Sequence, residues 1–173
     1  MRLDSKICIV TGAGSEGSIG EAIARRFVAE GAIVLVSDID FAKAEITSRA
    51  LGPSTVPWQC DVTHSSAVET MVTATVEQFG QLDVMVNNVG FTTPGFLGEL
   101  TDDAWLSILN GNLTSTFYGV RAALKPMRKQ RSGSIINIGS AAGIGGAPGL
   151  GAYGAAKAGV ASLTQTAAIE NSK

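Results

Sequence analysis

The sequence contains little cysteine, histidine or clustered charge. Its 173 residues include 2 Cys and 1 His, 16% are charged, and the net charge is −2. No run of Lys or Arg is longer than two residues, so the sequence lacks the basic surface that binds nucleic acid or an anionic membrane. The one histidine, His64, has no cluster of ligand-type residues beside it, which leaves no support for a metal site.

Several motifs are also absent. Cys8 and Cys60 lie far apart in apolar runs without C-x-x-C spacing, so we expect two reduced, buried thiols. There is no G-x-S-x-G for a Ser-His-Asp hydrolase and no G-K-[ST] for an NTPase. No stretch approaches the roughly 18 apolar residues of a membrane span, and the opening MRLDSK lacks the apolar core of a signal peptide. We therefore expect a cytoplasmic protein.

Apolar residues and glycine are abundant. Hydrophobic residues make up 45% of the chain, and there are 21 glycines without a collagen-like period. This length and apolar content suit one domain with a substantial core, which we assign to residues 1–173. We expect the glycines in turns and at close backbone approaches.

Short apolar runs alternate with helical patterns. The runs predict strands at 6–10, 32–37, 56–60, 82–86 and 134–138. The helical patterns cover 19–30, 41–51, 65–79, a segment from an N-cap at Thr101 to about 125 or beyond, and a segment from about 152 to the end. We expect Pro126 to kink or end the fourth helix. This alternation is typical of an α/β fold, a doubly wound, Rossmann-type parallel sheet of order 3-2-1-4-5 with helices on both faces.

A glycine-rich segment, TGAGSEGSIG at 11–20, follows the first strand and opens the first helix. Its glycines match G-x-G-x-x-G, whose amides at a helix N-terminus suit a pyrophosphate. The candidate cofactor residues of this turn are Gly12, Gly14, Ser15, Gly17, Ser18 and Ile19.

Asp38 ends the second predicted strand. A carboxylate there can accept hydrogen bonds from a ribose 2′-hydroxyl and would repel a 2′-phosphate. Glu16 adds a second negative charge, and no basic residue lies within 11–20. The sequence therefore predicts NAD in preference to NADP. Two alternatives remain: Asp40 as the acceptor, or Asp38 as a solvated turn residue or helix N-cap.

Tyr153 and Lys157 lie at i and i+4 on the last predicted helix, so they share one face. A phenol ordinarily titrates near ~10, and an ammonium close by favours the phenolate. The pair is therefore a candidate for proton exchange with a substrate oxygen.

Ordered motifs along the chain resemble those of the short-chain dehydrogenase/reductase family. They are TGAGSEGSIG, Asp38, CDV at 60–62, NNVG at 87–90, GNL at 111–113, NIGS at 137–140 and YGAAK at 153–157. The resemblance runs through essentially the whole chain. It implies an NAD(P)-dependent oxidoreductase that interconverts a secondary alcohol and a ketone by hydride transfer.

The resemblance also implies a role for each matching residue. Tyr153 would be the general acid and base, Lys157 would assist it and bind the nicotinamide ribose, and Ser140 would polarise the substrate oxygen. Asn112 would interrupt its helix and anchor a water relay behind Lys157, and Asn87 would brace the sheet. The other cofactor contacts would be Asp61, Val62, Asn88 and Gly90.

The sequence departs from the family pattern at two places. The turn from Gly12 to Gly20 is stretched by two residues, so that Gly17 or Ser18 takes the place of the middle glycine. The chain also stops at Lys173, about where the Tyr–Lys helix ends. We therefore expect it to lack the family's last strands and substrate lid, as a fragment or a short form. The fifth strand would be an edge that favours association, and the nicotinamide half of the cleft would be incomplete.

The expected substrate loops, 91–98 and 141–151, contain apolar side chains and no Arg or Lys. They favour a small apolar alcohol or ketone. Alternatives are a 3-oxoacyl-thioester reductase, a non-catalytic dinucleotide-binding partner protein, and a fold that binds S-adenosylmethionine. The family resemblance further implies a homodimer or homotetramer that pairs through the helices of Asn112 and Tyr153.

Overall fold

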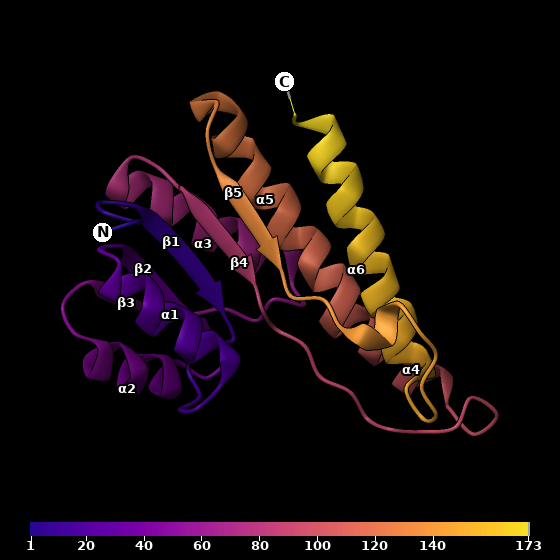
Figure 1. Ribbon diagram of the computed structural model, residues 1–173. Coiled ribbons are helices and arrows are strands. Elements are labelled where there is room, and N and C mark those ends of the chain that lie inside the picture. Colours follow the sequence, from indigo (N-terminus) through magenta and orange to yellow (C-terminus); the bar gives the residue numbers. More distant parts are fainter. Residues whose placement is uncertain (173) are drawn as a thin grey trace.

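Five parallel strands form one sheet in the order β3-β2-β1-β4-β5. The structure is a computed structural model that describes residues 1–172. β1 and β5 point in the same direction, as expected for a parallel sheet (Figure 1). The strands are β1 Ile7–Thr11, β2 Ile33–Asp38, β3 Thr55–Gln59, β4 Val84–Asn87 and β5 Ser134–Asn137. The predicted fold class and strand order are thereby confirmed.

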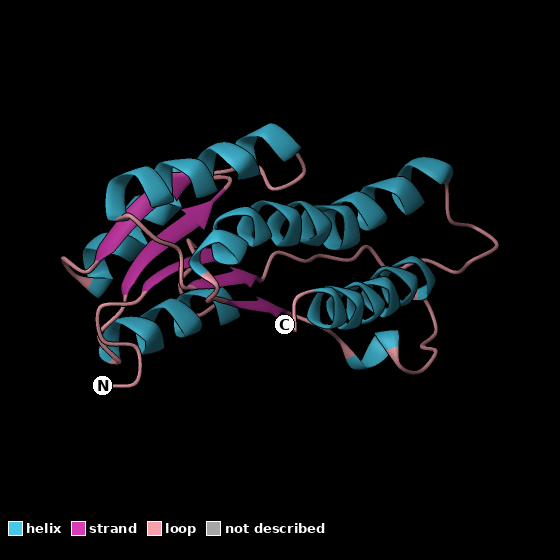
Figure 2. Ribbon diagram, turned by 90° about the horizontal axis from the view of Figure 1, so that it is seen from above, coloured by secondary structure: helices cyan, strands magenta, loops and turns pink. Residues whose placement is uncertain are grey.

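Helices cover both faces of the sheet (Figure 2). They are α1 Ile19–Ala29, α2 Phe41–Leu51, α3 Ser65–Phe79, α4 Asp102–Leu109, α5 Ser115–Gln130 and α6 Gly151–Glu170. A π-helical turn, η1 Asn110–Thr114, joins α4 to α5, and a 3₁₀ turn, η2 Ala141–Gly143, precedes α6. The last helix was predicted to run to the end of the chain, but α6 ends at Glu170 with Asn171 as its C-cap, and only Lys173 lies outside the described residues. No helix within residues 1–172 is long and apolar enough to cross a bilayer.

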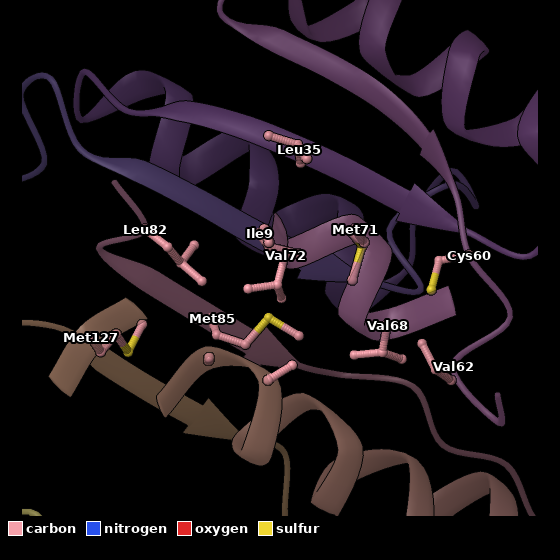
Figure 3. Packing of buried hydrophobic residues seen from close by; sticks show 12 residues of the cluster. Ile9, Leu35, Cys60, Val62, Val68, Met71, Val72, Leu82, Met85 and Met127 are labelled. Carbon is pink, nitrogen blue, oxygen red and sulfur yellow. The ribbon is translucent and has the colours of Figure 1, made fainter. Parts of the chain in front are cut away.

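The core has two layers because alternate strand residues face opposite sides. Ile9, Leu35 and Met85 pack against α3 and α5, and Figure 3 shows this layer with Met71 of α3 and Met127 of α5. The other layer joins the remaining strand residues to α1 and α2. Burial on both faces explains why the strands are almost continuously apolar. Both thiols are free and buried in this core, as predicted.

β5 is an edge strand among the described residues, where it pairs only with β4. Its residues alternate between exposed and half-buried, whereas every residue of β4 is buried. A groove of about 620 Å³ lies beside it, lined by α5, β5 and α6.

The helix predicted from Thr101 to about residue 125 or beyond is divided by η1, in line with the interruption expected at Asn112. Of the two outcomes expected for Pro126, a kink or an end, the end does not occur, because α5 continues to Gln130. The last turn is tied to the strand layer, since the Gln130 side-chain amide accepts from Leu82 N (3.1 Å) and donates to Leu82 O (2.9 Å).

Candidate functional site

A cleft of about 540 Å³ opens at the carboxyl ends of the strands. It brings together most of the site residues predicted from the sequence. Those lining it are Gly12, Ser15, Ser18, Ile19, Asp38, Asp61, Val62, Asn88, Gly90, Tyr153 and Lys157. The other four predicted residues, Gly14, Gly17, Asn112 and Ser140, are not among its lining residues. Lining residues that were not predicted include Ile39, Phe91 and Ile138.

The glycine turn brings α1 close to β1. Gly12 has a φ of +62°, which favours glycine. A Cβ on Gly20 would overlap the carbonyl oxygen of Gly12, so this glycine allows the close approach. Ser18 is the N-cap of α1, and its Oγ accepts from Glu21 N at 3.1 Å. The amides of Ile19 and Gly20 donate to no acceptor among residues 1–172, which leaves them available to an anion.

Gly17 and Ser18, the two candidates in the stretched part of the turn, differ in their position relative to the cleft. Gly17 is exposed, has a φ of +71° and would have no atom within 4 Å of an added Cβ. Its role is therefore to permit the backbone conformation. Ser18, by contrast, lines the cleft.

Asp38 lies in the cleft at the end of β2. Its Oδ2 accepts from Gly14 N (3.0 Å) and its Oδ1 from Asp40 N (3.2 Å), so backbone amides orient the carboxylate. Asp40 instead caps α2, with Oδ1 accepting from Ala42 N at 3.0 Å. The structure therefore assigns the helix cap to Asp40 and the cleft position to Asp38.

Residues after β4 connect the sheet to the turn. Asn88 Nδ2 donates to the carbonyl oxygens of Thr11 (2.9 Å) and Gly12 (3.1 Å). Asn87 Nδ2 donates to Asn137 Oδ1 (2.8 Å), a bridge from β4 to β5 that agrees with its expected bracing role.

Asp61 and Val62 line the cleft after β3. Burial acts to raise the pKa of the Asp61 carboxyl, but hydrogen bonds from Thr63 and the neighbouring His64 outweigh burial and lower it. His64 Nδ1 lies 3.0 Å from Asp61 Oδ2, on an exposed side chain. Asp61 is therefore ionised at neutral pH.

Tyr153 and Lys157 project from α6 into the cleft. Lys157 is 3% exposed, its Nζ donates to Ile138 O (2.8 Å), and Nζ lies 5.7 Å from the centroid of the Tyr153 ring. Burial lowers the pKa of this ammonium. Gly90 packs against it, since a Cβ on Gly90 would lie 3.1 Å from Lys157 Nζ. A poorly hydrated cation thus lies beside a phenol.

Asn112 lies in η1 and is fully buried. Its Nδ2 donates to Phe91 O (2.8 Å) and Ile108 O (2.9 Å), and its Oδ1 accepts from Phe91 N (3.2 Å). The side chain thus ties the helix to the loop after β4. The predicted interruption of the helix is confirmed and takes the form of a π turn.

Ser140 is the N-cap of η2, beside α6. Its Oγ accepts from Ala142 N (3.2 Å), so the hydroxyl hydrogen stays available for another acceptor. η2 packs closely on α6, because a Cβ on Gly143 would lie 2.7 Å from Ala158 N. This packing fixes Ser140 relative to the helix of Tyr153.

A family model and a solved structure both match this chain to short-chain dehydrogenases. The family model described as short chain dehydrogenase matches residues 6–173. A structure of a putative short-chain dehydrogenase/reductase from Burkholderia xenovorans is 41% identical with a TM-score of 0.92, covering 99% of this chain and 71% of that one.

Curated relatives differ in their named substrates. The (5R,7aS)-5-hydroxy-7a-methyl-1-oxo-2,3,5,6,7,7a-hexahydro-1H-indene-carboxyl-CoA reductase of Mycobacterium tuberculosis is 40% identical, covering 97% of this chain and 66% of its own length. The 3-oxoacyl-[acyl-carrier-protein] reductase of Thermotoga maritima is 38% identical, with 98% and 70% covered. Galactitol 2-dehydrogenase of Agrobacterium fabrum is 35% identical, with 98% and 66% covered. The chain spans about two thirds of the length of these relatives.

Proposed function

The chain belongs to the short chain dehydrogenase family, and from this we propose that it acts as an oxidoreductase that interconverts a secondary alcohol and a ketone with NAD. The observation that carries the proposal is the composition of one cleft. An acceptor for ribose, Asp38, lines it together with the turn before α1, and Tyr153 and Lys157 line it from α6.

The residues of the cleft fit a dinucleotide. The unpaired amides of Ile19 and Gly20 suit a pyrophosphate at the N-terminus of α1. Asp38 has lone pairs left after its two backbone hydrogen bonds, and these can accept from a ribose hydroxyl. The same negative charge would repel a 2′-phosphate, which supports NAD over NADP.

The chain supplies proton transfer and orientation around the reacting carbon. The cofactor would supply the hydride as NADH in reduction and accept it as NAD⁺ in oxidation. In reduction, Tyr153 donates its phenolic proton to the ketone oxygen, and in oxidation the phenolate takes the alcohol proton. Lys157 favours the phenolate, because its ammonium lies in a poorly hydrated site 5.7 Å from the ring. Ser140 donates its free hydroxyl hydrogen to the same substrate oxygen.

Apolar loops next to α6 favour an uncharged substrate. The loops after β4 and after η2 are joined by a hydrogen bond from Gly95 N to Gly149 O (3.0 Å). They expose Phe96, Leu97 and Ile144. A small apolar alcohol or ketone suits these side chains. A 3-oxoacyl thioester is the second candidate, favoured by the Thermotoga maritima relative, whose name gives a 3-oxoacyl substrate.

A cofactor and substrate screen tests the proposal. NADH and NADPH would each be offered with a panel of apolar ketones and a 3-oxoacyl thioester, and binding would be followed separately by NADH fluorescence. We expect NADH oxidation with at least one ketone and weaker use of NADPH. NADH binding without turnover of any substrate would instead support a non-catalytic dinucleotide-binding protein.

A further inference from the structure

Gly14 is held from two sides by groups outside the glycine turn. Its N–H donates to Asp38 Oδ2 at 3.0 Å, and its carbonyl oxygen accepts from Thr47 Oγ1 at 2.9 Å. Thr47 lies on α2, and the hydrogen bond is buried. Among residues 1–172, no other side-chain hydrogen bond joins α2 to the turn. Thr47 is therefore the polar link between α2 and the turn.

The packing around Gly14 leaves little room for adjustment. A Cβ there would lie 2.9 Å from both Ala44 N and Asp38 Oδ2. The backbone of the turn thus rests directly on the backbone of α2 and on the Asp38 carboxylate. A movement of the Gly14 peptides would have to move Asp38 as well.

Because the peptide bond is planar, the hydrogen bond from Thr47 to Gly14 also determines the direction of the Ser15 N–H. The carbonyl of Gly14 and the N–H of Ser15 belong to one trans peptide, so they point in opposite directions. Because the carbonyl points to Thr47 on α2, the Ser15 N–H points away from α2. Ser15 lines the cleft. Thr47 therefore fixes the orientation of a backbone donor near the proposed pyrophosphate position.

We propose that Thr47 is a positioning residue for the dinucleotide, acting through Gly14 on the Ser15 amide and the Asp38 carboxylate. The inference rests on the proposed function, because it assumes that a dinucleotide occupies the cleft. Without the Thr47 hydroxyl, the Gly14 carbonyl has no donor among residues 1–172, and the Gly14–Ser15 peptide is held only by the contacts of Gly14 with Asp38 and Ala44. Nucleotide binding then weakens, and the preference for NADH over NADPH falls with it.

Three variants test the inference by NADH and NADPH fluorescence titration, with thermal unfolding measured in parallel. Thr47→Val keeps the shape and removes the hydroxyl, and Thr47→Ser restores the hydroxyl. Thr75→Val is the matched control, because Thr75 is also buried but donates to Met71 O (2.8 Å) within its own helix. We expect Thr47→Val to weaken NADH binding roughly fivefold, the contribution of one hydrogen bond. We also expect it to reduce the ratio of the NADH affinity to the NADPH affinity. Thr47→Ser and Thr75→Val should bind NADH within about twofold of wild type, a difference smaller than one hydrogen bond.

The outcomes separate this inference from the proposed function. If the wild type binds NADH and Thr47→Val binds it equally well, the inference is wrong and the proposed function stands. If Thr47→Ser binds as weakly as Thr47→Val, the hydroxyl is not the cause, and the inference is again wrong. A folded wild type that binds no NADH overturns both.

Discussion

Replacing Gly90 by alanine should impair catalysis while leaving the fold in place. The added methyl would lie 2.8 Å from Asn112 Oδ1 and 3.1 Å from Lys157 Nζ. Asn112 is fully buried and bonded to Phe91 and Ile108, so it cannot move without losing hydrogen bonds. The 2.8 Å contact therefore forces the Gly90 backbone to shift away from Asn112, and the Lys157 ammonium, which packs against the same residue, is displaced with it.

The size of the effect follows from these distances. A misplacement of about 1 Å in a catalytic site lowers the rate on the order of 100-fold. Because Lys157 needs to move by less than this, we expect Gly90→Ala to lower kcat roughly 10- to 100-fold. Overpacking lowers the free energy of unfolding by about 1–3 kcal/mol. Replacing glycine raises it by about 0.4–1 kcal/mol, because alanine restricts the conformations of the unfolded chain. The net loss of stability should be on the order of 1 kcal/mol.

The assay is NADH-dependent ketone reduction, with urea unfolding measured on the same samples. Thr75→Val is the control, because Thr75 is buried on α3, donates to Met71 O (2.8 Å) and does not line the cleft. It should lose about 1 kcal/mol of stability with its hydrogen bond and keep wild-type kcat. If Gly90→Ala also keeps wild-type kcat, the position of the ammonium does not limit the chemistry.

Three further predictions concern other parts of the chain. Asp38→Asn should weaken NADH binding about tenfold and improve binding of NADPH relative to NADH, because it removes the charge that repels a 2′-phosphate. Fluorescence titration measures both dissociation constants, and an unchanged ratio of the two would contradict the assignment of Asp38. Burial acts to raise the pKa of Asp83, but hydrogen bonds from Ile7 N, Lys6 and Gln81 outweigh burial and lower it. The ionised carboxylate therefore stabilises the fold fully above about pH 4, the pKa of Asp in the unfolded chain. This contribution is lost as the pH falls through the lower pKa of the folded state. In Asp83→Asn, the free energy of unfolding in urea should therefore vary less with pH between roughly pH 6 and pH 3, and a pH slope equal to that of the wild type would count against the argument. Burial raises the pKa of the Cys8 thiol to about 12 and that of the Cys60 thiol to about 11. Iodoacetamide at roughly pH 8, near the pKa of a free thiol, should therefore modify neither cysteine in the folded protein and both cysteines in urea. Rapid labelling of the folded protein would show that the thiols are accessible.

The sheet was predictable because its signals are local. Each strand is a short apolar run, and each crossover helix shows apolar spacing, so chain order alone led to the parallel sheet. Asp38 was predictable for the same reason: its place at a strand end follows from the boundary of that strand, and parallel strands end at one edge.

Features that depend on contacts between distant segments were not predictable. Gly14 matched a phosphate-binding motif, yet its backbone contacts Asp38 and Thr47, and Thr47 has no motif of its own. The side chain of Gln130, in the last turn of α5, bonds to Leu82, 48 residues away in the sequence, and no local pattern marks that contact.

The proposed reaction depends on proton transfer by the Tyr153 phenol in a dinucleotide-binding cleft. The decisive experiment compares Tyr153→Phe with Tyr118→Phe, because these are the 2 tyrosines of the chain and Tyr118 packs beside Arg121 on α5, outside the cleft. We expect Tyr153→Phe to reduce ketones at least 100-fold more slowly, the usual contribution of a general acid, while it still binds NADH. Tyr118→Phe should keep both properties. If Tyr153→Phe reduces ketones at the wild-type rate, the phenol is not the acid and the proposed mechanism is wrong.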